Sequence, residues 1–247
     1  MLLSGMTAVV TGSNRGIGKS IIQTFAANGC DIFACARTQS EEFEKDIANI
    51  SQEYNITIQP HYFDLLNKDE VKNETKEILN LGKQIDIVVN NAGVAHGSLF
   101  QMLKTDALKE VFDINTFAQL SFTQGFIRHM TKNKSGSIIN IGSTAGIIGD
   151  IGTVAYGSSK AALMYSTKAI ANELGRYNIR VNSVAPGITK TDMYNEMEDK
   201  ALDKALSSIS LGRAADPEEI SNVVLFLASG LSLYVTGQTI KVDGGSF

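Results

Sequence analysis

The sequence predicts a doubly wound α/β fold, with one sheet of about seven mostly parallel strands and helices on both faces. Short apolar runs alternate with amphipathic stretches from one end of the chain to the other. Most of these runs are apolar on both faces, as is typical of parallel strands that lie between two layers of helices. Hydrophobic residues make up 43% of the chain and charged residues 19%, which is an ordinary globular composition.

The individual elements follow from this alternation. The apolar runs predict strands at 7–12, 31–36, 56–64, 86–93, 136–143, 179–186 and 238–245. The amphipathic stretches between them predict helices at 17–28, 40–54, 67–80, 104–130, 154–176 and 216–228. The last helix opens with a capping Asp216 followed by Pro217 in the first turn. Because the three prolines fall at element boundaries and no linker or repeat interrupts the pattern, we expect a single domain over residues 1–247.

Composition argues against several classes of protein. The net charge of -4 comes without a basic block, so nucleic acid is not an expected partner. No apolar run approaches the roughly 20 residues that span a bilayer, and the opening MLLSGMTAVV lacks a leader pattern, so we expect no membrane partner and a cytoplasmic location. Cys30 and Cys35 lie in a strand-like run and are interpreted as core residues rather than a disulfide. The three histidines form no ligand cluster, so no metal is expected.

The first strand leads into a glycine-rich turn and then a helix, an arrangement in which backbone amides can bind a pyrophosphate. Strand-to-helix turns often use glycine for other reasons, so the motif gains its weight from the elements on either side. The candidate cofactor-binding residues of this loop are Gly12, Ser13, Asn14, Arg15, Gly16, Ile17 and Gly18.

The end of the second strand indicates which dinucleotide is preferred. In dinucleotide folds an acidic residue there binds the adenosine ribose and repels a 2′-phosphate, but this chain has Ala36 at that place. Arg37 follows, and with Arg15 it offers two guanidinium groups that can converge on a phosphate. NADP(H) is therefore the expected cofactor. The alternative is that both arginines are merely solvated surface residues.

With these features the sequence resembles the short-chain dehydrogenase/reductase family over essentially its full length. The motifs that carry the resemblance occur in order: Thr11-Gly12-x-x-x-Gly16-x-Gly18, Asn90-Asn91-Ala92-Gly93, Asn115, Ser143, Tyr156-x-x-x-Lys160 and Pro186-Gly187. The resemblance implies a Rossmann-type fold and the catalytic set Asn115, Ser143, Tyr156 and Lys160. It also implies further cofactor contacts from Asp64, Leu65, Asn91, Ala92, Gly93, Tyr156, Lys160, Pro186, Gly187, Ile188 and Thr189.

The residue types suit the reduction of a ketone. Hydride delivery leaves an alkoxide, so the site must donate a proton and stabilise negative charge. Tyr156 is the candidate donor, and Lys160 lies one helical turn later on the same face, where an ammonium group is expected to lower the pKa of the phenol. Ser143 is expected to hold the substrate carbonyl, and the resemblance implies that Asn115 anchors a water that resupplies protons through Lys160. A Tyr-x-x-x-Lys pair on its own is also common on helix surfaces.

Within the family the sequence is most similar to the β-ketoacyl-acyl-carrier-protein reductases, on the segments 186–193, 211–220 and 234–245. That resemblance implies NADPH, a homotetramer packed through the long helices, and acyl carrier protein as a partner. The arginines by which those reductases dock the carrier protein are replaced here by Lys134 and Tyr177. Nearby cations offer a substitute positive field, namely Arg128, Lys132 and Arg176.

Two other functions stay open at this stage. The same fold serves reductases of sugars, polyols and other small secondary alcohols, and the shape of the expected substrate-covering segment, about 188–210, decides between them. A catalytically silent NADP(H)-binding regulator is a third possibility, disfavoured because Ser143, Tyr156 and Lys160 are all present. His96 follows the Asn90–Gly93 turn and is interpreted as a solvated loop residue, with a substrate contact as the alternative.

Overall fold

The computed structural model describes residues 1–195 and 199–246, which form an α/β sandwich of the predicted class. Its described strands build one parallel sheet in the order β3-β2-β1-β4-β5-β6-β7. The strands are β1 (Thr7–Thr11), β2 (Asp31–Ala36), β3 (Ile58–Tyr62), β4 (Ile87–Asn90), β5 (Gly136–Ile141), β6 (Ile179–Pro186) and β7 (Thr239–Val242). The predicted fold class is confirmed, and each predicted strand contains one of these strands.

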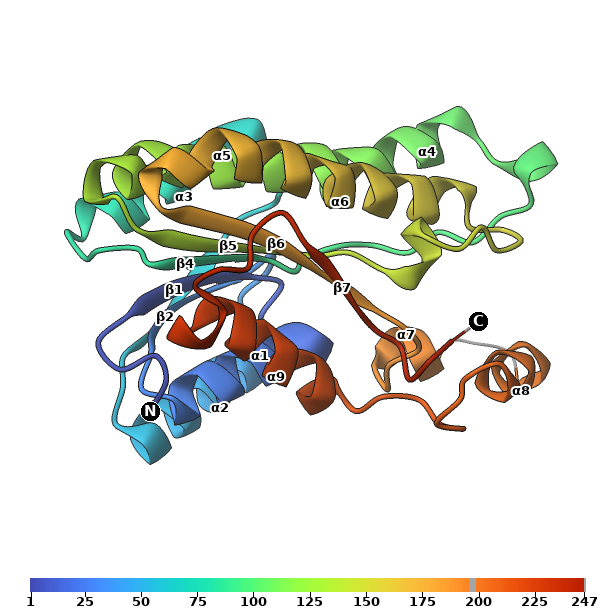
Figure 1. Ribbon diagram of the computed structural model, residues 1–247, viewed down its shortest axis with the longest axis horizontal. Helices are drawn as coiled ribbons and strands as arrows, with labels where there is room; N and C mark the ends of the chain where they lie inside the picture. Colours follow the sequence, from blue (N-terminus) through green and yellow to red (C-terminus); the bar gives the residue numbers. More distant parts are fainter. Residues whose placement is uncertain (196–198, 247) are drawn as a thin grey trace.

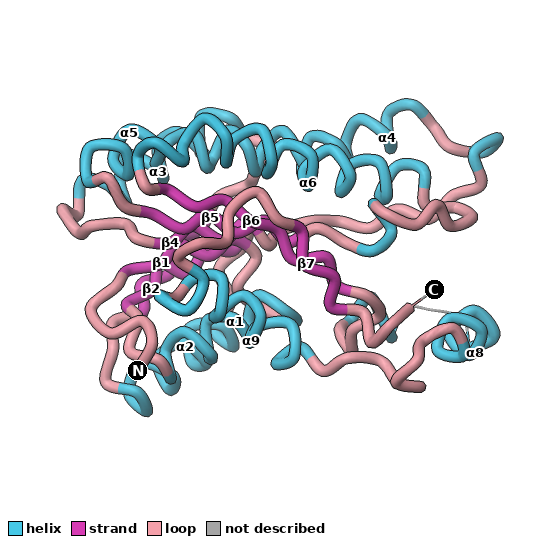
Figure 2. The backbone as a smooth tube through the Cα atoms, viewed as in Figure 1, coloured by secondary structure: helices cyan, strands magenta, loops and turns pink. Residues whose placement is uncertain are grey.

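Helices cover both faces of the sheet (Figure 1). On one face lie α1 (Gly16–Ala27), α2 (Glu41–Tyr54) and α9 (Pro217–Ala228). On the other lie α3 (Lys68–Asn80), α4 (Thr105–Phe112), α5 (Gln119–Asn133) and α6 (Val154–Leu174). Figure 2 shows the strands sandwiched between these two helical layers, with the short helices α7 (Asp192–Asn195) and α8 (Asp199–Ser207) beyond the sheet edge.

The central strands are buried on both sides because their side chains point alternately into two apolar cores. In β1, Ala8 and Val10 pack in the core beneath α1, α2 and α9, whereas Val9 packs in the core beneath α3, α5 and α6. In β5, Ile139 packs in the first of these cores and Ile138 in the second. This explains why the strands read as continuous apolar runs in the sequence.

The helical segment predicted at 104–130 is not one α-helix. After α4 the chain makes one π-helical turn, η2 (Asp113–Ala118), before α5 begins. Two further helices, α7 and α8, occur in the segment 188–210, for which no helix was predicted. Residues 196–198 of that segment lie outside the described residues.

Candidate active site

The candidate site lies where the order of the sheet reverses. Successive strands add toward one edge from β1 to β3 and toward the other from β4 to β7, so the loops that follow β1 and β4 border a crevice at the carboxyl ends of the strands. The two loops are in direct contact. The Asn91 side-chain amide donates hydrogen bonds to the carbonyl oxygens of Thr11 and Gly12, at 3.0 and 2.9 Å.

Glycine is required in the loop after β1 because the backbone is so closely packed. A Cβ on Gly12 would lie 2.8 Å from the Ala92 Cα, and Gly12 also has a positive φ of 63°. A Cβ on Gly18 would overlap the carbonyl oxygen of Gly12. These contacts hold the first turn of α1 directly against the loop after β4.

The start of α1 has unused hydrogen-bond donors. Arg15 occupies the N-cap position with extended backbone, but its side chain makes no capping hydrogen bond, and the first turn contains no acidic residue. The free amides of this turn therefore carry partial positive charge and suit an anion such as a pyrophosphate. The cradle thus fits the phosphates of a dinucleotide.

Ser13 joins the glycine loop to the end of β2. Its backbone N–H and its hydroxyl both donate to the Cys35 carbonyl oxygen, at 3.1 and 3.0 Å, and the residue is completely buried. Arg37 lies two residues beyond this anchor. It is exposed and forms no side-chain hydrogen bond or ion pair with any residue that the structure describes.

The two arginines expected at a 2′-phosphate differ in their surroundings, because Arg15 is held in an ion pair and Arg37 is not. The Arg15 guanidinium forms an ion pair with Asp192, the first residue of α7, with 2.9 Å between Nη1 and Oδ2. Arg15 therefore points toward the segment after β6. The sequence gives no sign of this contact because the partners are 177 positions apart.

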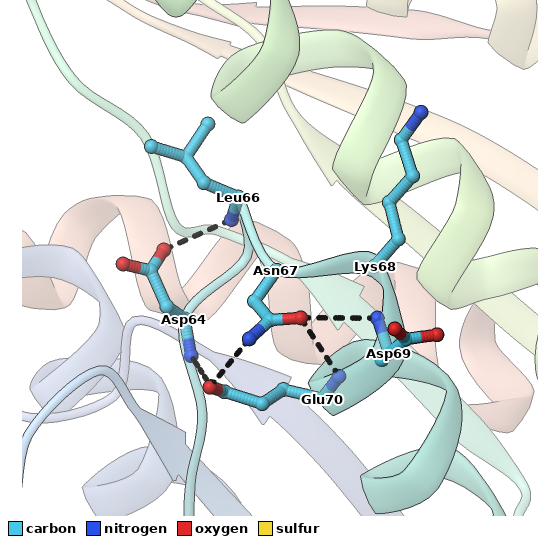
Figure 3. A pocket seen from close by; sticks show the side chains of 6 residues that line it. All are labelled: Asp64, Leu66, Asn67, Lys68, Asp69 and Glu70. Carbon is cyan, nitrogen blue, oxygen red and sulfur yellow. Dashed lines mark hydrogen bonds between the residues drawn. The ribbon is translucent and has the colours of Figure 1, made fainter.

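The loop after β3 forms a pre-organised hollow, shown in Figure 3. Asn67 caps α3 by accepting hydrogen bonds from the N–H groups of Asp69 and Glu70, and the Glu70 carboxylate accepts from Asp64 N and the Asn67 amide. One Asp64 carboxylate oxygen accepts from Leu66 N at 2.9 Å. The carboxylate of Asp64 points away from Asn67 and Glu70, where it can accept a hydrogen bond from a base. Leu65 is partly buried and packs against the apolar core.

Ser143 and Tyr156 come together at the carboxyl end of β5. Ser143 precedes the short helix η3 (Thr144–Gly146) and its hydroxyl accepts a hydrogen bond from Ala145 N at 3.1 Å. Burial raises the pKa of Tyr156 above its usual value, and the neighbouring Ser143 hydroxyl lowers it in part.

Lys160 lies one turn after Tyr156 on the buried face of α6. Its ammonium nitrogen is 6.0 Å from the centre of the Tyr156 ring and donates to the Ile141 carbonyl oxygen at 2.7 Å. Burial lowers the pKa of Lys160 to about 8. The pKa of Tyr156 is raised rather than lowered as expected, because the largest cause is desolvation of the phenol, and Ser143 rather than Lys160 opposes it.

Asn115 lies in the π-helical turn and is completely buried. Its side-chain amide accepts from Val94 N at 2.8 Å and donates to Val94 O and to the Ser159 hydroxyl, at 2.9 and 3.1 Å. A Cβ on Gly93 would lie 3.1 Å from Asn115 Oδ1 and 3.3 Å from Lys160 Nζ. Both polar groups therefore pack closely around the same backbone position, where a side chain on residue 93 would crowd them.

The loop after β6 is held by backbone hydrogen bonds. Gly187 N donates to Val242 O at 2.9 Å, and a Cβ on Gly187 would lie 2.9 Å from the Asp243 Cα. Ala215 N donates to Ile188 O, and the buried Thr189 donates its hydroxyl proton to Gly187 O at 3.1 Å. Pro186 ends β6, so this loop leaves the sheet beside the Ser143 site.

Sequence reasoning missed two supporting polar residues. The buried Gln119 donates to the Ala92 carbonyl oxygen at 2.8 Å and accepts from the Thr11 hydroxyl, which itself accepts from Asn91 N and Ala92 N. Ser159 links Asn115 to the carbonyl oxygen of Tyr156, at 3.1 and 2.7 Å. Both lie inside helical segments, so no local signal separates them from solvated polar residues.

Other features of the described residues bear on the expected classes. No group of three or more His, Cys, Asp or Glu side chains in the described ranges is arranged to hold a metal ion. Among the described helices, none is long and apolar enough to cross a membrane. Cys30 and Cys35 are buried free thiols. His96 is half-buried, and its side chain has no hydrogen-bond partner among residues 1–195 and 199–246.

Comparison with known proteins gives matches over almost the whole chain. A family model described as enoyl-(acyl carrier protein) reductase matches residues 11–246. The 3-oxoacyl-(acyl-carrier-protein) reductase FabG of Aquifex aeolicus is 38% identical over 99% of this chain and 98% of that protein. The 3alpha-hydroxysteroid dehydrogenase of Mediterraneibacter gnavus is 34% identical over 100% and 98%. A solved structure of a short chain dehydrogenase/reductase family protein matches with a TM-score of 0.87 and 35% identity, over 99% and 98% of the two chains.

Proposed function

The chain belongs to the short-chain dehydrogenase/reductase family, and we propose that it reduces 3-oxoacyl thioesters with NADPH. Its relatives make it an oxidoreductase that acts on CH–OH and C=O groups with a nicotinamide cofactor. The observation that carries the proposal is the juxtaposition of Ser143 and Tyr156 at the end of β5, with the Lys160 ammonium beside the Tyr156 ring. The full-length similarity to 3-oxoacyl-(acyl-carrier-protein) reductases supports the substrate class.

In the proposed reaction the nicotinamide cofactor, when bound, supplies the hydride to the carbonyl carbon. The Ser143 hydroxyl holds the carbonyl oxygen, and the Tyr156 phenol donates its proton to the oxygen as negative charge develops there. The raised pKa of Tyr156 keeps the phenol protonated at neutral pH and therefore ready for reduction. Lys160 stabilises the phenolate that remains after proton transfer, and in oxidation the same groups act in reverse.

Asn115 is assigned as a positioning residue. Its amide is committed to Val94 and Ser159, and it fixes both the loop after β4 and the first half of α6. The closeness of Asn115 Oδ1 and Lys160 Nζ to the same point beside Gly93 supports the water implied by the family resemblance, because two polar groups lie near each other there. Such a water is the route by which the proton of Tyr156 is replaced through Lys160.

The cofactor proposal is NADP(H). It is supported by the absence of an acid at Ala36 and by the two exposed guanidinium groups, Arg37 and Arg15. Arg37 is free to meet a 2′-phosphate at the end of β2, whereas Arg15 must first leave Asp192. The phosphate cradle at the start of α1 serves either dinucleotide, so discrimination rests on these arginines.

We propose acyl carrier protein as a partner that docks on the cations Lys134 and Arg176. Both are exposed, and the Asn178 side chain donates to the Lys134 carbonyl oxygen at 3.3 Å, which joins the ends of α5 and α6. Arg176 lies over the Tyr177 ring, 4.9 Å from its centre. We also propose the homotetramer implied by the family resemblance, and the covering role of residues 188–210.

The experiment that tests the proposed function follows NADPH oxidation at the nicotinamide absorbance. Acetoacetyl thioester is offered on a small carrier mimic and on acyl carrier protein, beside a panel of ketones and keto-sugars. We expect turnover of both thioesters, with the lower KM for the substrate on carrier protein. Tight NADPH binding without turnover of any substrate would instead support a silent regulator.

A second candidate is an oxidoreductase of a different secondary alcohol. The specific observation in its favour is the hydroxysteroid dehydrogenase that is 34% identical over the whole chain. The same Ser143 and Tyr156 pair would serve that chemistry. Including a 3-ketosteroid in the panel separates the candidates, because the ratio of kcat/KM values for the steroid and the thioester ranks them directly.

A further inference from the structure

The ion pair between Arg15 and Asp192 links two parts of the proposed site that have different tasks. Arg15 precedes α1 in the glycine loop, and Asp192 begins α7 in the segment that follows β6. The pair is exposed, with 72% of the Arg15 side chain and 59% of the Asp192 side chain accessible. Both charged groups are therefore open to a ligand that arrives from solvent.

Neighbouring contacts hold the two segments in register. A Cβ on Gly16 would lie 3.2 Å from the Thr191 side chain, so the glycine loop touches the residue before Asp192. Lys190 N donates to Ala215 O at 2.9 Å, and the Lys190 ammonium pairs with Asp216 at 2.9 Å. The chain that leads into Asp192 is thus held against the glycine loop and against the start of α9.

The direction of the Arg15 side chain matters because of the strand order. β2 lies on one side of β1, whereas β6, which leads to α7, lies on the other side beyond β4 and β5. Figure 1 shows α7 well separated from β2. The guanidinium that is paired with Asp192 is therefore engaged by the segment that follows β6 and not by the end of β2, where Arg37 lies.

We propose that Asp192 is a cofactor-specificity residue that competes with the 2′-phosphate of NADPH for Arg15. This inference rests on the proposed use of NADP(H). When NADPH binds, the phosphate draws Arg15 toward Arg37 and the ion pair with Asp192 breaks. When NADH binds, no phosphate competes, and Arg15 stays on Asp192. Occupancy of the phosphate position is thereby coupled to the anchoring of α7 at the start of the covering segment.

Two physical reasons favour binding of Arg15 to either Asp192 or the 2′-phosphate, rather than to both at once. Phosphate recognition by arginine is strongest when two parallel N–H donors face the same anion, and Asp192 already takes Nη1. A carboxylate and a phosphate on one guanidinium would also place like charges close together, which opposes binding of the second anion. Removing the Asp192 charge should therefore strengthen NADPH binding rather than weaken it.

The test measures dissociation constants of NADPH and NADH from nucleotide fluorescence at fixed ionic strength, without turnover. In Asp192→Asn we expect NADPH to bind about two- to fivefold more tightly, the worth of an exposed ion pair, and NADH to bind as in the unaltered protein. Asp31→Asn is the matched control. It removes one negative charge from a partly exposed ion pair with Lys83 at the start of β2, and it should leave the ratio of the two constants unchanged.

A double-mutant cycle shows whether the effect passes through Arg15. Arg15→Gln should weaken NADPH binding, and Asp192→Asn should then have no further effect in that background. Weaker NADPH binding in Asp192→Asn, an unchanged constant, or an equal gain in the Arg15→Gln background would overturn the inference. If Arg15→Gln leaves NADPH binding unchanged, Arg15 does not bind the 2′-phosphate, and the proposed basis of NADP(H) preference fails together with this inference. If Arg15→Gln weakens NADPH binding but Asp192→Asn does not strengthen it, only the competition by Asp192 fails.

Discussion

At the scale of single residues, burial and hydrogen bonding set the protonation states of the proposed catalytic pair. Tyr156 and Lys160 are both withdrawn from water, and desolvation favours the neutral form of each. It therefore moves their pKa values in opposite directions, upward for the phenol and downward for the ammonium. The pair suits proton donation to substrate, since the phenol holds its proton while the ammonium can release one close to neutral pH.

Replacement of Tyr156 by phenylalanine tests the proton donor. We expect Tyr156→Phe to lower kcat by at least about 10²–10⁴-fold, because general acid catalysis is lost. The dissociation constant of NADPH should stay nearly the same. Tyr165→Phe is the matched control, because Tyr165 is on the same helix but 74% exposed, and it should keep full activity. A fully active Tyr156→Phe enzyme would show that Tyr156 is not the proton donor.

The pH dependence tests Lys160. Its lowered pKa, about 8, means that the free protein loses the ammonium charge as pH rises through that value. We expect kcat/KM for NADPH, which reports on groups of the free enzyme, to fall by about tenfold per pH unit above this point. Lys160→Arg should abolish this fall, whatever its activity, because the guanidinium stays protonated. A profile that stays flat to pH 9.5 in the unaltered enzyme contradicts the assignment.

At the scale of elements, the junction of β1 and α1 shows how close packing creates the phosphate cradle. In Gly18→Ala the new methyl group would overlap Gly12 O and lie 2.5 Å from Asn91 Nδ2. We expect the loop to shift and the NADPH dissociation constant to rise more than tenfold, by titration of nucleotide fluorescence. Gly175→Ala is the control, because nothing lies within 4 Å of its Cβ position and its φ is negative. That variant should bind NADPH normally and unfold no more readily.

The same scale shows what the sequence could predict. The strands were predictable because two-sided burial gives an apolar run, and the glycine loop because positive φ values and close approach demand glycine. The π-helical turn at Asn115 was not, since the helical periodicity runs on from α4 into α5. The turn accompanies tertiary hydrogen bonds from Asn115 to Val94 and Ser159, which no local pattern encodes. The ion pair of Arg15 with Asp192 could not be predicted either, because it too is a tertiary contact that no local pattern encodes.

At the scale of the whole molecule, the proposed catalytic residues and the proposed docking surface for the carrier protein lie at opposite ends of α6. Tyr156 lies near its first residue and Arg176 just beyond its last, and its 21 residues span about 30 Å. A carrier protein bound at Arg176 therefore lies far from Tyr156 of the same chain. In a twofold pair whose α6 helices pack antiparallel, the Arg176 end of one copy lies beside the Tyr156 end of the other. The proposed tetramer would then deliver substrate across subunits.

Charge reversal at the docking surface tests the carrier-protein proposal. Arg176→Glu should raise KM for the acetoacetyl thioester on acyl carrier protein by about tenfold or more, because a favourable contact with an acidic partner becomes repulsive. The KM for the small carrier mimic should not change. Arg213→Glu, an exposed cation elsewhere whose partner is Glu219, controls for the change in net charge. Equal effects on both substrates would show a general loss of structure instead.

Subunit mixing then decides whether delivery crosses between copies. Co-expressed chains carrying Arg176→Glu alone and Tyr156→Phe alone are purified as hybrids through two different tags. In a hybrid, the intact Arg176 of the inactive copy lies beside the intact Tyr156 of its neighbour if the helices pack antiparallel. We expect the hybrid to recover a low KM for the carrier-borne substrate, at up to about half the kcat of the unaltered enzyme because only half the copies hold Tyr156. A hybrid whose KM stays as high as that of Arg176→Glu alone shows that docking surface and site belong to the same chain.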